Sequence, residues 1–410
     1  MLTVAKLNYY LIVVVLFFSV VFPNVLKPVV VTFMFLSFLL SLPYIKVRSE
    51  LKVFYLMFLF SVLVTIFFIC VGLHNGAPEN SVLLVTFIYI ISPLLWLVIL
   101  TFFVQHFTYD KIVSLLVLFS ILGCISVAVY FYLFLNYGPS SVSFFESGTN
   151  VNMNSDGYSG AIMHVFGSLI FLGGGFFFYP NVIKSLNVKF FILLIIFLTM
   201  VFAGRTALTL AIVLSSFMFF TVLSVKFVLN RYSPIKFFFI ITLAIFVFFS
   251  LIIVIREFSG VDFLYIASVF FDKSMSGGGG ARVEQASALF EGIENSFVLG
   301  KGHGVGVDYI RSDDFPWRYE LVWIATVLRV GFIGAFIYSI PYMFYLFIFF
   351  KRMKGSQLTS LDKFFFGSWV AVFLASNTNP YIEAFSFQWM FIMPLVFLFN
   401  DTTSNSYEKA

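Results

Sequence analysis

The residues with the clearest capacity for chemistry are basic side chains gathered in one polar segment, residues 256–319, between stretches that are almost wholly apolar. Its lysines and arginines are Arg256, Lys273, Arg282, Lys301, Arg311 and Arg318. A guanidinium group binds phosphate oxygens through two parallel hydrogen bonds. We therefore expect this segment to bind an anionic substrate, with Arg282, Lys301, Arg311 and Arg318 as the candidate binding residues.

Arg205 is a further candidate, because Gly204-Arg-Thr206 forms nearly the whole connection between two apolar stretches. So short a connection places the guanidinium at the mouth of a helix bundle, where Arg205 and Arg282 together would suit a pyrophosphate. Two plainer roles stay open. Arg205 could extend to lipid headgroups, and Arg282 could pair with an acidic neighbour or a headgroup.

Glu320 follows the polar segment directly and is the candidate general base. A carboxylate at the start of a helix also complements the helix dipole, so a structural role stays open. The nearby run Val298-Leu-Gly-Lys-Gly-His-Gly304 resembles a phosphate-binding turn but lacks the spacing GxxxxGK[ST]. A plain glycine turn is the preferred interpretation.

A short amphipathic helix is expected between these groups. Four consecutive glycines, Gly277–Gly280, indicate a flexible joint. The residues that follow place apolar side chains at helical spacing: Val283, Ala286, Leu289, Phe290 and Ile293. Arg282 falls in the first turn of this helix, where a cation is unfavourable against the helix dipole and needs an anionic partner.

The composition of the chain indicates a polytopic membrane protein of all-α class, a single membrane domain over residues 1–410. Apolar residues make up 61%, charged residues only 10%, and the mean hydropathy is +1.04, far from a soluble domain. Only helices satisfy the backbone in stretches of this length and polarity. Twelve spans are predicted: 7–23, 28–44, 52–73, 82–104, 112–136, 159–179, 189–203, 206–225, 237–255, 331–350, 363–378 and 384–399.

Residues 320–350 are too long for one upright span. Gly331 and Gly334 predict a break, with a separate half-helix over Arg318–Val330. Arg329 supports this division, because a charge facing lipid is costly and prefers an interface or a protein-lined cavity.

The distribution of basic residues predicts the orientation. Most of the 24 lysines and arginines fall in alternate connections, which the positive-inside rule assigns to the cytoplasm. Both termini are then cytoplasmic, and residues 137–158 and 256–319 form outer loops. This bias accounts for the net charge of +5 without a nucleic-acid partner. The loop 137–158 is either a solvated connector or a sugar-contacting surface.

Neither a metal nor another cofactor is expected. Cys70 and Cys124 fall inside predicted spans, where a thiol behaves as a small apolar residue, and the four histidines lack metal-ligand spacing. No internal repeat of the kind found in transporters is visible. The one large polar loop belongs to the second half alone, which favours an enzyme over a carrier.

From about Gly204 to Gly334 the chain resembles the superfamily of O-antigen polymerases (Wzy-type) and O-antigen ligases. The resemblance rests on the order of several short motifs within this topology. They are Gly204-Arg-Thr206, Arg282, Ser296-Phe-Val-Leu-Gly-Lys-Gly-His-Gly304, Glu320-Leu-Val-Trp-Ile-Ala and Gly331-Phe-Ile-Gly334.

The resemblance implies metal-independent glycosyl transfer at the outer face of a bacterial inner membrane. A glycan on undecaprenyl pyrophosphate would pass to a hydroxyl of another lipid-linked repeat unit, and a chain-length regulator protein is a candidate partner. Arg205 and Arg282 match the family's arginines, which would hold the pyrophosphate. Glu320 stands where ligases carry a histidine, and His303 lies upstream of that position. A polymerase is therefore favoured over a ligase that transfers to lipid A-core.

A lipid-linked oligosaccharide flippase is the third hypothesis. Transport would need ionisable residues along a path through the spans. Apart from Arg329 the predicted spans hold almost none, which counts against this function.

Overall fold

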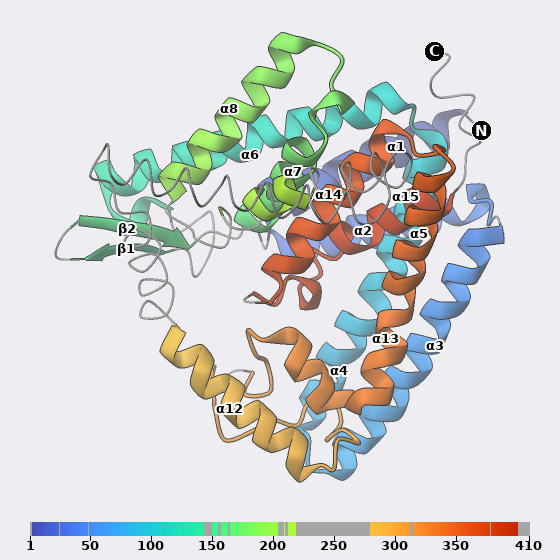
Figure 1. The fold of residues 1–410 in the computed structure, drawn as a ribbon, viewed down its shortest axis with the longest axis vertical. Coiled ribbons are helices and arrows are strands. Elements are labelled where there is room, and N and C mark those ends of the chain that lie inside the picture. The colour runs from blue at the N-terminus through green and yellow to red at the C-terminus, as the bar shows by residue number, and fades with distance from the viewer. Residues whose placement is uncertain are drawn as a thin grey trace, which may run out of the picture.

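The computed structural model describes residues 2–23, 25–47, 49–142, 150–154, 157–162, 165–203, 209, 212–218, 279–311, 315–377 and 379–400. These residues are predominantly helical, as expected (Figure 1). Six helical stretches among them are long and apolar enough to cross a membrane: Val4–Val21, Lys27–Tyr44, Ser49–His74, Glu79–His106, Tyr109–Tyr137 and Val322–Lys354. The described part of the chain is therefore compatible with a multi-pass membrane protein.

The main helices are α1 (Leu2–Val21), α2 (Lys27–Ser41), α3 (Ser49–His74), α4 (Glu79–Thr86), α5 (Ser92–His106), α6 (Tyr109–Tyr137), α7 (Val165–Phe178), α8 (Leu186–Ala203), α12 (Gly279–Asn295), α13 (Val322–Lys354), α14 (Ser360–Ala375) and α15 (Trp389–Phe399). A π-helical turn, Phe87–Ile91, joins α4 to α5. Short 3-10 helices cover Leu42–Tyr44, Pro139–Val142, Pro180–Val182 and Tyr381–Glu383. The number of spans stays a prediction; of 206–225 and 237–255, only residues 209 and 212–218 are described.

One antiparallel hairpin departs from the all-α expectation. It pairs β1 (Asn150–Asn154) with β2 (Gly157–Ile162) inside the expected loop 137–158 and beyond its end. The next helix, α7, consequently begins at Val165 rather than near residue 159. Two residues separate the strands, a length common for hairpin connections.

The predicted span 384–399 also differs, because only α15 is a regular helix there. The irregular backbone before α15 is supported by the buried side chain of Gln388. Its amide nitrogen donates to the carbonyls of Ile88 (2.7 Å) and Ile382 (3.0 Å), and its oxygen accepts from Ser92 Oγ (2.6 Å). Non-helical backbone is tolerated among apolar helices where protein satisfies it in this way.

The expected break in α13 is confirmed at Gly331, whose φ of 64° and ψ of −179° lie outside the helical region. The half-helix before it begins at Val322, not at Arg318. A left-handed φ strains any residue with a side chain, and here space is lacking too. A Cβ atom at Gly331 would lie 2.5 Å from the carbonyl oxygen of Leu299.

The loop from Leu299 to Gly304 packs between this break and α3, which runs beside α13 (Figure 1). Its backbone N–H groups donate to helix carbonyls: Lys301 to Leu328 (2.7 Å), Gly302 to Arg329 (2.9 Å) and His303 to Phe68 (2.9 Å). These N–H groups are therefore not free to bind a phosphate. This geometry fits the plain glycine turn rather than a phosphate cradle.

Candidate functional site

Glu320 lies between two arginines of the expected binding set. Its Oε2 atom accepts from Arg282 Nε at 2.9 Å, and its Oε1 atom is 3.0 Å from Arg311 Nη2. The three side chains are a quarter to two-fifths exposed. The structure thus joins two candidate anion-binding residues to the candidate base, and the acidic partner of Arg282 is Glu320, a residue not expected to pair with it.

Helix α12 positions Arg282, and its existence as an amphipathic helix is confirmed. Its apolar residues Leu289 and Ile293 pack against Ala325 and Leu328 of α13. One turn from Arg282, the buried Gln285 accepts hydrogen bonds from the backbone N–H groups of Glu320 (3.0 Å) and Leu321 (2.9 Å). The orientation of Glu320 is therefore fixed through its backbone as well as its carboxylate.

The prediction of a flexible joint at Gly277–Gly280 is wrong for its second half. Gly279 and Gly280 form the start of α12 rather than a hinge. The first two glycines, Gly277 and Gly278, lie outside the described residues, as do residues 256–276, with Arg256 and Lys273 among them. The helix therefore begins two residues earlier than a flexible joint at residues 277–280 would allow.

A second, deeper cluster surrounds Glu383, which is almost fully buried. Arg329, also buried, forms an ion pair with Glu383 Oε1 and donates to Tyr89 Oη at 2.9 Å. Tyr89 in turn donates to Glu383 at 2.8 Å. The expectation that Arg329 avoids lipid is confirmed, because its charge is paired inside the protein.

This cluster reaches the first one through the peptide of Trp317 and Arg318. The carbonyl of Trp317 accepts from Arg329 Nη2 at 3.1 Å. Arg318 Nε lies 3.8 Å from Glu383 Oε2, and Arg318 Nη2 donates weakly to the Glu383 carbonyl at 3.5 Å. The Arg318 side chain is a quarter exposed, and its partner Glu383 is buried. This pairing fixes the chain two residues before Glu320.

His303 lies beside the second cluster and is buried. Its Nε2 atom is 3.2 Å from Tyr338 Oη, which is 2.7 Å from Thr65 Oγ1. Burial, assisted by the positive charge of Arg329, lowers the pKa of His303 from the ordinary 6.5 to about 3. The imidazole is therefore neutral in the folded protein at neutral pH.

Acid should consequently destabilise the protein through His303. A folded pKa below the unfolded one means that the unfolded chain takes up a proton first, so stability present above about pH 6.5 is lost as the pH falls. We expect the melting temperature in detergent to drop progressively as the pH falls from about 6.5 to 4, and His303→Asn to flatten this slope. His74→Asn, at an exposed histidine, is the control, and an equal slope in all three proteins would contradict this assignment.

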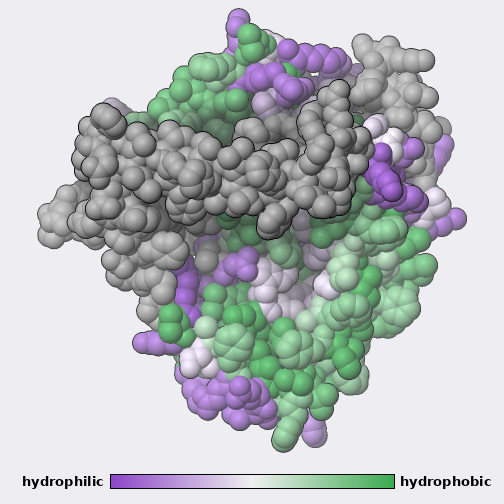
Figure 2. Space-filling model, viewed as in Figure 1, coloured by the Kyte–Doolittle hydropathy of each residue, from purple (hydrophilic) through white to green (hydrophobic). Residues whose placement is uncertain are grey.

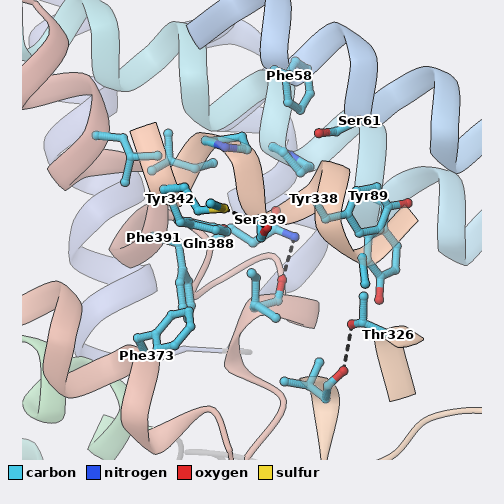
Figure 3. Close-up of a pocket in the computed structure, with 18 of the residues that line it drawn as sticks. Phe58, Ser61, Tyr89, Thr326, Tyr338, Ser339, Tyr342, Phe373, Gln388 and Phe391 are labelled. Atoms are coloured by element: carbon cyan, nitrogen blue, oxygen red, sulfur yellow. Dashed lines mark hydrogen bonds between the residues drawn. The ribbon is translucent and has the colours of Figure 1, made fainter. Parts of the chain in front are cut away.

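A cavity of about 480 Å³ adjoins the second cluster at Tyr89. Its lining is mostly apolar and comes from α3, the turn before α5, α13, α14 and α15. Tyr89 and Tyr338 lie on one side, with Phe373 and Phe391 on the other (Figure 3). Val322 and Trp323, the first residues of α13, also line it; they follow Glu320 by two and three residues in the chain.

No family model matches the chain, and no curated protein does either. Assignment of a function therefore rests on the residues and their geometry.

The other expected site residues are not all brought together. Arg205 lies outside the described residues, so its place beside Arg282 stays a prediction. The Lys301 Nζ atom lies near Gly292 in α12, ten residues and roughly 15 Å along the helix from Arg282. Lys301 is thus separate from the cluster of Arg282, Arg311 and Glu320.

Two site residues were missed from the sequence, Glu383 and Tyr89. A signal existed for Glu383: it is a lone carboxylate at the edge of an apolar stretch, just as Arg329 is a lone cation near the start of another. Opposite charges in such positions usually pair with each other. Tyr89 offered no comparable signal among so many aromatic residues.

Proposed function

We propose that this protein is a membrane-embedded glycosyltransferase, an O-antigen polymerase that transfers a glycan from undecaprenyl pyrophosphate to a hydroxyl of another lipid-linked repeat unit. The observation that carries the proposal is the pairing of Arg282 and Arg311 with the two oxygens of Glu320, two residues before Val322 in the lining of an apolar cavity. A lipid-linked pyrophosphate needs both parts, cations for its head and an apolar space for its chain.

In this proposal the pyrophosphate competes with Glu320 for the guanidinium groups. Once the arginines bind phosphate oxygens, the carboxylate is released and accepts the proton of the acceptor hydroxyl. The hydroxyl oxygen forms a bond to the anomeric carbon, and the bond from that carbon to the pyrophosphate oxygen breaks. Arg282 and Arg311 stabilise the charge that develops on the departing undecaprenyl pyrophosphate, and Arg205 and Arg318 are further candidates for this role.

The location of the site within the chain supports an outer-face reaction. The basic residues Lys351, Arg352 and Lys354 end α13, and Arg352 pairs there with Glu50 at the start of α3. Gly331 lies about 20 residues from this basic end, and Glu320 precedes the half-helix on the far side of the break. With the basic end in the cytoplasm, Gly331 marks the opposite boundary, and we propose that the site is reached from the outer face of the bacterial inner membrane, with both termini cytoplasmic.

The alternatives receive less support. An O-antigen ligase would use a histidine. His303 is buried behind Tyr89 and Tyr338 and has no direct access to an acceptor. A flippase would need ionisable groups along its path. Within the described residues, the buried charges Arg329 and Glu383 are paired with each other.

The test is product formation by the purified protein with undecaprenyl-pyrophosphate-linked repeat units, first without and then with lipid A-core. We expect a ladder of lipid-linked glycans without lipid A-core. Arg282→Ala should lower this activity by about 100-fold or more, because one of the two cations facing the pyrophosphate is lost. Lys354→Ala, at an exposed cation on the far end of α13, is the control and should keep full activity.

The remaining outcomes separate the hypotheses. Product only with lipid A-core would identify a ligase, and a folded protein without product in either reaction would favour transport. Normal activity of Arg282→Ala would remove the pyrophosphate-binding role, and the same measurement on Arg205→Ala tests the arginine that the structure does not describe.

A further inference from the structure

The turn after α12 presents three consecutive apolar side chains to the outside. Phe297 is 82% exposed, Val298 42% and Leu299 68%. Phe297 and Val298 also have positive φ angles, 50° and 58°. Two adjacent left-handed residues with side chains, one of them β-branched, are unfavourable, so the surrounding contacts must impose this conformation.

Those contacts are present in the structure. The Val298 N–H donates to the carbonyl of Ile293 at 3.1 Å, and its carbonyl accepts from Phe332 at 3.3 Å. The turn is thereby attached both to the end of α12 and to the residue after the break at Gly331. These hydrogen bonds hold the turn in one conformation, in which Phe297 and Leu299 point outward.

Two long helical segments beside the turn give its height. Gly331 and Lys351 are 20 residues apart in α13, which corresponds to roughly 30 Å of helix, the thickness of a bilayer's hydrocarbon core. Lys52 and Gly72 have the same separation in α3, and a Cβ atom at Gly302 would lie 2.1 Å from the Gly72 nitrogen. If the basic ends mark one hydrocarbon boundary, the turn lies at the other.

The surface beside the turn is apolar as well. A groove of about 600 Å³ runs between α3 and α13, and every side chain lining it is apolar. Leu63, Phe67 and Ile333 border the groove, are more than half exposed, and are continuous with Val298 and Leu299, which close one end of it. Figure 2 shows the hydrophobic surface over this side of the molecule.

We propose that the Ser296–Leu299 turn is a membrane-interface anchor: Phe297 and Leu299 insert at the hydrocarbon boundary, and the groove holds an acyl chain of a membrane lipid. The bilayer is favoured over a protein partner because the surface is wholly apolar and continuous with helices long enough to cross the membrane. The anchor fixes the C-terminal end of α12, whose N-terminal turn carries Arg282.

The test is spin-label accessibility in vesicles of phosphatidylethanolamine and phosphatidylglycerol. Single cysteines replace Phe297, Leu299 and Phe67 in turn, in a background with Cys70→Ser and Cys124→Ala. Collision with oxygen, which is enriched in hydrocarbon, is compared with collision with a water-soluble nickel chelate. Glu291→Cys, on the exposed acidic side of α12, is the control. Size-exclusion chromatography confirms that each labelled protein is folded.

We expect the oxygen-to-nickel ratio at 297 and 299 to match that at 67 and to exceed that at 291 several-fold. A ratio at 297 and 299 equal to that at 291 would show a water-exposed turn and overturn the proposal. Low accessibility to both reagents would show that a second copy of the chain or another protein covers the turn, which also overturns it.

Discussion

Replacing Glu320 by glutamine is expected to slow glycan transfer by about 100-fold to 10 000-fold, while binding of the lipid-linked donor is kept or strengthened. Glutamine has the shape of glutamate but cannot accept the proton of the acceptor hydroxyl. It also no longer competes as an anion for Arg282 and Arg311. Single-turnover rates and donor titrations on the same preparation separate the two effects.

The fold should tolerate this change. The three side chains of the cluster are partly exposed, and ion pairs of this kind contribute at most about 1 kcal/mol to stability. The backbone of Glu320 keeps its hydrogen bond to Gln285. Glu284→Gln, at an exposed carboxylate on α12, is the matched control. Unchanged turnover with Glu320→Gln would mean that Glu320 only neutralises the two arginines.

Features set by local sequence were predictable. The apolar periodicity after residue 281 predicted α12, and Gly331 predicted the break in α13, because helical spacing and a missing side chain act over a few residues. The hairpin was not predicted, because the polarity of residues 137–158 is typical of a loop. The class of membrane-compatible helical protein followed from composition alone.

The contacts of the site were not predictable in the same way. Glu320 and Arg282 were expected to act separately, yet they form one ion pair across 38 residues. The pair between Arg329 and Glu383 joins residues 54 apart, and it depends on how α13 packs near the segment before α15. Such pairings follow from tertiary packing, which one sequence without contacts does not determine. The role of Arg205 stays a prediction for the same reason.

Removing the carboxylate of Glu383 should have the largest effect on stability. Glu383→Ala leaves the guanidinium of Arg329 buried without its counter-ion, and breaking a buried pair from one side costs about 3–5 kcal/mol. We expect a strongly lowered unfolding midpoint in detergent, followed by tryptophan fluorescence. Glu50→Ala removes a partly exposed (30%) partner of Arg352 at the other end of α13 and should cost much less. Equal losses in both variants would contradict a special role for the buried pair.

A double variant separates stability from function. Arg329→Met with Glu383→Leu removes both charges, and replacing a whole buried pair by apolar residues is often neutral for stability. The unfolding midpoint should therefore recover well above that of Glu383→Ala. Glycan transfer should stay well below that of the unmodified protein. The Trp317 carbonyl loses its donor, and Arg318 loses the carboxylate near its Nε. A stable double variant with full activity would mean that this pair supports the fold alone, and that Arg318 needs no positioning beside the cavity.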